Sequence, residues 1–151
     1  MNSEAASIYQ DVIIENAKRP RNFGPIDGAT CVLQAHNPLC GDQLTLFVTL
    51  ADDTIVDIGF EGSGCAISTA SASLMTVAAK GLSREQALEL FTNVHTMLTV
   101  DTVPGDEEPD VGKVVALSGV REYPTRVKCA SLAWQTLRGA LTGDQRVART
   151  E

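Results

Sequence analysis

Apolar residues recur along the chain at two spacings, one typical of helices and one typical of strands. In residues 4–17, Ile8, Val12 and Ile13 form a stripe at helical spacing, which predicts a first helix. The stretch KRPRNFGP follows, and its prolines and glycine cannot continue a helix. The sequence therefore predicts a helix and then an irregular crossing before the first strand.

Three short segments then have the residue types of strands. The first is ATCVLQAHNP, residues 29–38, and the next two are residues 44–50 and 54–62, which are rich in β-branched and apolar residues. Ala51, Asp52 and Asp53 separate the last two, a spacing that favours a hairpin. We therefore expect a three-stranded antiparallel meander.

The rest of the chain is predicted to be helical. Residues 65–79 form a helix with a small face, and Ser83 with Gln86 fits a capping box for a helix ending near Leu98. An acidic loop over 100–112, a short helix over 113–120 and a last helix beginning at Pro124 complete the chain. The predicted fold class is α+β, with helices packed on one face of a small antiparallel sheet. We expect a single domain over 1–143 and a frayed tail over 144–151.

Composition and charge exclude several classes of protein. The 151 residues are 44% hydrophobic and 21% charged, as in an ordinary globular domain, and the formal net charge is −7. No Lys or Arg lies between Arg21 and Lys80, which argues against a nucleic-acid partner. No apolar run approaches the length of a membrane span, and the first residues lack the pattern of a signal peptide. We therefore expect a cytoplasmic protein with no membrane or nucleic-acid partner.

Four cysteines are present: Cys31, Cys40, Cys65 and Cys129. Cytoplasmic thiols stay reduced, which favours metal binding or catalysis over a disulfide framework. Cys31 lies within an apolar strand and is interpreted as a core thiol. Cys40 precedes Asp42 by one glycine in a turn, where a cation could bind both side chains; a buried cysteine beside a turn aspartate explains the pair equally well.

Cys65 and Cys129 occupy positions that favour the thiolate. Cys65 follows a Gly-Ser-Gly segment and opens a predicted helix, whose free N–H groups stabilise negative charge. Cys129 lies early in the last helix, next to Arg126 and Lys128. Each also has a structural interpretation, as a small core residue or as part of a helix start with solvated charges.

Together, three thiols and one carboxylate form a set of four donors. Zinc binds such sets tetrahedrally, and iron–sulfur clusters also use thiolates. His36 and His95 are weaker candidates, because the first can point away from Cys40 and the second lies in a helix that we interpret as structural.

Four stretches together resemble the IscU/NifU N-terminal family of iron–sulfur cluster assembly proteins: IYQDVIIENAKRPRNFG, NPLCGDQLTLFVTL, GSGCAISTASASLMT and SGVREYPTRVKCASLAWQTL. The resemblance covers about residues 7–140. Lys128 stands where IscU-like members carry a histidine, and the stretch before Cys129 lacks their proline-rich chaperone-binding segment. The acidic segment over 100–112 also matches an insertion of SufU-like members, so the chain is more similar to these.

The resemblance implies a zinc site formed by Cys40, Asp42, Cys65 and Cys129. It also implies a sulfurtransferase-like carrier that stimulates a SufS-like cysteine desulfurase, takes its persulfide sulfur on Cys40 and passes it to downstream iron–sulfur assembly proteins. The basic residues Arg126 and Lys128, in an otherwise acidic chain, are expected to help bind the desulfurase. Two alternatives remain open: an IscU-like scaffold that holds a transient iron–sulfur cluster, and a purely structural zinc protein.

Overall fold

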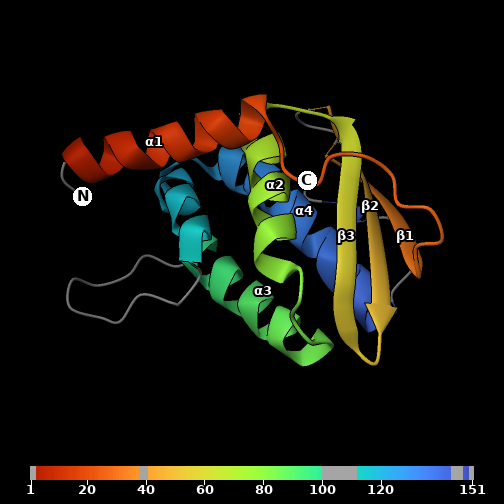
Figure 1. The fold of residues 1–151 in the computed structure, drawn as a ribbon. Helices are drawn as coiled ribbons and strands as arrows, with labels where there is room; N and C mark the ends of the chain where they lie inside the picture. Colours follow the sequence, from red (N-terminus) through yellow and green to blue (C-terminus); the bar gives the residue numbers. More distant parts are fainter. Residues whose placement is uncertain (1–2, 38–40, 100–111, 144–147, 150–151) are drawn as a thin grey trace.

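The computed structural model describes residues 3–37, 41–99, 112–143 and 148–149. Figure 1 shows a small sheet with helices gathered on one of its faces. In chain order the elements are α1 (Ser3–Lys18), β1 (Cys31–Asn37), β2 (Asp42–Ala51), β3 (Thr54–Ser63), α2 (Ala66–Ala79), α3 (Arg84–Thr99), the 3₁₀ helix η1 (Gly112–Glu122), α4 (Pro124–Thr142) and β4 (Ala148–Arg149). The predicted α+β architecture is confirmed.

The sheet contains the three predicted antiparallel strands. β2 lies between β1 and β3, pairing Asn37 with Asp42 on one side and Gln43 with Ser63 on the other. The β2–β3 hairpin turns through Asp52 and Asp53, whose φ angles of 52° and 60° are both positive. Two consecutive positive φ angles match the right-handed twist of the flanking strands, so this turn pairs Ala51 with Thr54, and the register then shifts between Leu50 and Thr49.

The sheet also has a fourth strand that the sequence pattern did not predict. β4 pairs parallel with β1 at Ala35 and His36. The other residues of the expected frayed tail, 144–147 and 150–151, lie outside the described residues, and so do residues 100–111 of the acidic loop predicted over 100–112. Gly112 begins η1. The domain boundary at 143 and the fraying of the tail stay predictions.

Along β1 and β2 every second residue is buried. The buried hydrophobic residues of the three long strands are Leu33, Ala35, Leu44, Leu46, Val48, Ile55, Ile58 and Phe60. Contacts with this sheet come from α2 and α4, while α1, α3 and η1 pack against those two helices. One hydrophobic cluster joins residues of the sheet, α2, α3, η1 and α4. The core therefore fixes how the first turns of α2 and α4 lie relative to the sheet edge.

The helix starts agree with the sequence signals. Ser83 and Gln86 form the predicted capping box, with reciprocal bonds of 3.0 and 3.1 Å between each side chain and the other residue's backbone N–H. Pro124 begins α4, where its missing N–H costs no helical hydrogen bond. Among the described helices, none combines the length and apolar character needed to cross a membrane.

Candidate metal centre

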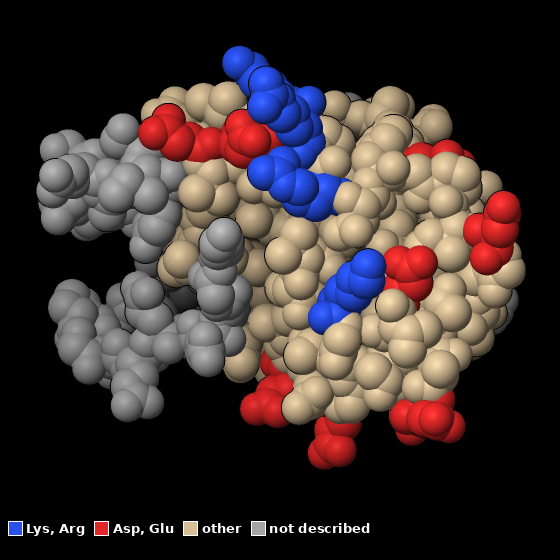
Figure 2. Space-filling model, viewed as in Figure 1, with Lys and Arg blue, Asp and Glu red and all other residues tan. Residues whose placement is uncertain are grey.

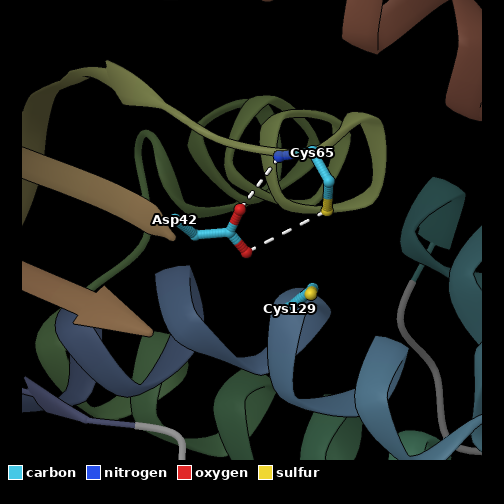
Figure 3. A group of neighbouring side chains, drawn as sticks. All are labelled: Asp42, Cys65 and Cys129. Atoms are coloured by element: carbon cyan, nitrogen blue, oxygen red, sulfur yellow. Dashed lines mark hydrogen bonds between the residues drawn. The ribbon is translucent and has the colours of Figure 1, made fainter. Parts of the chain in front are cut away.

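Asp42 begins β2, and its side chain is fully buried. Its Oδ1 accepts a hydrogen bond of 2.9 Å from the backbone N–H of Cys65. Burial of a carboxylate is costly unless hydrogen bonds or a cation compensate for the lost water. The bond to Cys65 supplies part of that compensation and leaves Oδ2 directed toward two sulfurs (Figure 3).

Cys65 is the N-cap residue of α2, with extended backbone angles φ −71° and ψ 168°. Its Sγ accepts a hydrogen bond of 3.4 Å from the backbone N–H of Ser68. A sulfur in this position lies at the positive end of the helix dipole and accepts a hydrogen bond from a backbone N–H. Both interactions are favourable for a negatively charged ligand atom. The sequence prediction that this cysteine opens a helix is confirmed.

Two glycines before Cys65 allow the chain to pack closely against β2. A Cβ at Gly62 would lie 2.1 Å from the carbonyl oxygen of Gln43, and the φ of Gly62 is 143°, where other residues are strained. A Cβ at Gly64 would lie 2.7 Å from Asp42 Oδ1. These glycines therefore allow the backbone of β2 and the carboxylate of Asp42 to lie close to the segment before Cys65.

Cys129 completes a group of three donors that come from three elements. It lies in the first turns of α4 and is 3% exposed. Its sulfur faces Asp42 and Cys65 in Figure 3, and the ligand atoms of all three residues lie within 4.8 Å of one another. Cys65 Sγ lies 4.0 Å from Asp42 Oδ2.

These separations fit a tetrahedral metal ion. Zinc bonds of about 2.3 Å to sulfur and about 2.0–2.2 Å to oxygen hold neighbouring ligand atoms about 3.5–3.8 Å apart. The 4.0 Å between Cys65 Sγ and Asp42 Oδ2 exceeds that spacing only slightly. Two thiols and one carboxylate are also donors that zinc accepts.

Other candidates from the sequence lie elsewhere. Cys40 lies outside the described residues, so its place as a fourth ligand stays a prediction. His36 lines a pocket of about 410 Å³ beside Gln43, which points to the opposite face of β2 from Asp42. His95 is exposed on α3, and its ring stacks on a phenylalanine 5.8 Å away. In the described part of the chain, neither histidine joins the three donors.

Cys31 has the character of a partly buried structural thiol. It lies at the start of β1 and packs against the hydrophobic core. Burial raises the pKa of its thiol, because the charged thiolate loses hydration there. This supports the interpretation of Cys31 as a core residue.

The two basic residues proposed for partner binding lie just before Cys129. Arg126 is exposed and Lys128 is partly exposed. Within the described ranges, neither forms an ion pair, whereas Arg21 lies 3.3 Å from Glu15 and Lys80 lies 3.6 Å from Asp57. Figure 2 shows one face of the molecule, on which Lys and Arg side chains gather near the end of α1 with Asp and Glu side chains beside them.

One contact behind the site has no signal in the sequence. Ser71 of α2 donates a hydrogen bond of 2.6 Å to the carbonyl oxygen of Ala130, the residue after Cys129. Trp134 donates its indole N–H to the same hydroxyl over 3.1 Å. A serine within a run of small residues looks like ordinary helix packing, so only the structure shows this link.

Comparison with known proteins agrees with the fold and the cysteine contexts. The NifU-like N-terminal domain family matches residues 8–130. An iron–sulfur cluster assembly scaffold protein IscU of Streptococcus pyogenes serotype M1 is 41% identical over 139 residues, which are 92% of this chain and 86% of that protein. The zinc-dependent sulfurtransferase SufU of Bacillus subtilis is 38% identical over 144 residues, 95% of this chain and 96% of that protein.

A solved structure from Fervidobacterium islandicum AW-1 has the same fold. It is named for an iron–sulfur cluster assembly scaffold protein of the SUF system, is 36% identical and superposes with a TM-score of 0.81, covering 93% of this chain and 99% of that one. The family match spans most of the chain, and the relatives align along nearly their whole length. This chain therefore belongs to the family of NifU-like N-terminal domains, with IscU and SufU proteins among its relatives.

Proposed function

We propose that this protein acts in iron–sulfur cluster assembly as a SufU-type, zinc-dependent sulfur carrier that works with a cysteine desulfurase. The observation that carries the proposal is the group of Asp42, Cys65 and Cys129, three donors within 4.8 Å of one another. The similarity to a zinc-dependent sulfurtransferase supports it. Lys128 adds support. IscU-like members carry a histidine at this place, whose imidazole can bind a metal, whereas the ammonium of Lys128 has no free electron pair for this role.

Asp42, Cys65 and Cys129 would hold the zinc, with Cys40 as the fourth ligand. When bound, zinc would keep the thiolates deprotonated and hold the starts of three elements together. Structural zinc sites commonly use only cysteine and histidine. A carboxylate is a harder ligand that exchanges more readily, which favours a site that opens during function. Asp42 therefore argues against a purely structural zinc protein.

Cys40 is the proposed sulfur acceptor. Its thiolate would attack the outer sulfur of the desulfurase persulfide and form a new S–S bond. The bond between that sulfur and the desulfurase cysteine would break, and this cysteine would leave as a thiolate, so the transfer is redox-neutral. Gly41, which follows Cys40, has a φ of 71° and bonds to the carbonyl oxygen of Asn37 over 2.9 Å. The turn predicted from the sequence, with glycine directly after Cys40, supports an accessible acceptor.

The exposed surface around Cys129 is the proposed docking site for the desulfurase. Arg126 and Lys128 lie there without ion pairs in the described part of the chain, so their charges are available to an acidic partner surface. Tyr123 is 56% exposed just before α4 and adds apolar area to the same surface.

A cluster scaffold is the second candidate function. It is favoured by the identity of 41% to a protein named as an IscU scaffold. Thiolates bind iron–sulfur clusters as well as zinc, so the donor group fits both functions. Protein purified without air distinguishes them: we expect about one zinc per chain and no brown chromophore. An iron–sulfur chromophore with little zinc would favour the scaffold.

Sulfur transfer is tested by mass spectrometry after incubation with a SufS-like desulfurase and cysteine. Trypsin leaves Cys31, Cys40 and Cys65 on one peptide, because no Lys or Arg lies between Arg21 and Lys80. Cleavage before aspartates, at Asp42 and Asp57, separates Cys65 from the other two.

We expect added sulfur on Cys40, with Cys31 unmodified in the fragment ions. The Cys40→Ser variant should no longer stimulate the desulfurase, and the Cys31→Ser variant should stimulate it as wild type does. Sulfur found first on Cys65 or Cys129, with Cys40 unmodified, would contradict the carrier mechanism.

A further inference from the structure

Directly behind the metal centre, α2 and α4 share one buried hydroxyl. Ser71 is fully buried, donates to the carbonyl oxygen of Ala130 over 2.6 Å and accepts from the indole N–H of Trp134 over 3.1 Å. Ala130 and Trp134 are four residues apart, which places them on the same face of α4. The hydroxyl therefore bonds to two successive turns of α4.

This link lies close to both cysteines of the site. Ser71 is six residues after Cys65 on α2, a distance of roughly 9 Å along a helix. Ala130 immediately follows Cys129. A shift of α4 along α2 would therefore change the separation of the two sulfurs.

Packing of the small residues next to the link restrains such a shift only weakly. Ala70 and Ala72 lie on either side of Ser71 in α2, and Ala133 precedes Trp134 in α4; all three are buried. Small side chains form shallow ridges, and dispersion contacts have little directional preference. A hydrogen-bonded hydroxyl in an apolar core has a definite geometry, because a shift that breaks its bonds leaves buried polar groups unsatisfied.

We infer that Ser71, together with Trp134, is a positioning residue that sets the alignment of α4 on α2 and so holds Cys129 at metal-binding distance from Cys65. The inference rests on the proposed metal site. Without the Ser71 hydroxyl, α4 would adopt a range of alignments, and metal binding would have to restore the productive one. The affinity for the metal would then fall by more than the loss of folding stability alone explains.

Ser73 provides a closely matched control. It lies two residues further along α2 and is also fully buried. Its hydroxyl donates to Asn16 Oδ1 over 2.7 Å and accepts from the backbone N–H of Arg21 over 2.8 Å. Ser71→Ala and Ser73→Ala therefore remove the same atom and the same number of hydrogen bonds, but only the first changes the contact with α4.

The test measures zinc affinity by competition with a chromophoric chelator, and the visible ligand-field spectrum of the cobalt-substituted protein. Urea unfolding of the metal-free protein measures stability separately. Both variants should lose similar stability. We expect Ser71→Ala to bind zinc about tenfold more weakly, as is usual for residues that orient ligands, and to change the cobalt spectrum. Ser73→Ala should retain the wild-type affinity and spectrum.

Wild-type affinity and an unchanged cobalt spectrum in Ser71→Ala would overturn the inference. Equal losses of affinity in both variants would also overturn it, since the effect would then follow stability alone. A wild-type protein that binds neither metal would instead overturn the proposed site. If Ser71→Ala does not fold, Trp134→Phe is tested in its place. A loss of zinc affinity smaller than that expected for Ser71→Ala, together with a changed cobalt spectrum, supports the inference. Unchanged zinc affinity and an unchanged cobalt spectrum contradict it.

Discussion

Replacing Gly64 with alanine should weaken the metal centre without changing any ligand. An added Cβ would lie 2.7 Å from Asp42 Oδ1 and 3.1 Å from its Cγ. Relief of these contacts to about 3.5 Å requires the carboxylate to move by roughly 0.8 Å. This movement would stretch the 2.9 Å bond from the Cys65 N–H and shift Oδ2 away from the sulfurs.

The expected magnitude follows from two opposing effects. Overpacking of a buried contact costs about 1–3 kcal/mol, and restriction of the unfolded chain by alanine returns about 0.4–1 kcal/mol. We therefore expect the metal-free Gly64→Ala protein to be about 1–2 kcal/mol less stable in urea unfolding. Displacement of a ligand should weaken zinc binding by about 10- to 100-fold in a chelator competition.

Gly119→Ala is the matched control, because an added Cβ there has no neighbour within 4 Å. It should leave zinc affinity unchanged. A second comparison isolates the contact: in an Asp42→Ala background Oδ1 and Cγ are gone and only the 3.3 Å contact with Cβ remains, so Gly64→Ala should destabilise the protein much less. Wild-type affinity and stability in Gly64→Ala itself would refute the reasoning.

Further predictions concern the ligands, the structural thiol and the partner surface. Cys65→Ser or Cys129→Ser should reduce the zinc content from about one per chain toward zero and lower stability, whereas Cys31→Ser should leave zinc unchanged by elemental analysis. Because burial raises the pKa of Cys31 above 9.0, its neutral form contributes stability that is lost as the pH rises above that value. In urea unfolding above pH 9, the Cys31→Ser protein should therefore lose less stability with rising pH than the wild-type protein does. Arg126→Glu should weaken desulfurase binding and stimulation with zinc retained; full stimulation would contradict the docking surface.

Features that depend on neighbouring residues could be predicted from the sequence. The hairpin at Asp52 and Asp53 and the capping box at Ser83 are encoded within four residues, and so is the placement of Cys65 at a helix start. The β-branched and apolar residues over 44–50 likewise predicted the strand β2. Such signals survive in a single sequence because the physical cause lies within one or two turns of chain.

Features that depend on distant contacts could not be predicted. Ser71 bonds to residues 59 and 63 positions away, and nothing in its local sequence distinguishes it from Ser73. The role of Gly64 depends on the approach of Asp42 from another strand. β4 is a two-residue strand that pairs with β1, from the opposite end of the chain. In each case the tertiary arrangement decides, and periodicity carries no information about it.

The three donors all lie where an element begins. Asp42 is the first residue of β2, Cys65 caps α2, and Cys129 lies in the first turns of α4. Cys129 also belongs to the hydrophobic cluster and Cys65 packs against it, but most of the cluster comes from the interiors of these elements, from Leu46 on β2 to Leu137 on α4. Exchange of a ligand at the element starts therefore leaves most of the core packed. The proposed carrier function needs such an arrangement, because the metal centre can then open for sulfur transfer while the fold stays intact.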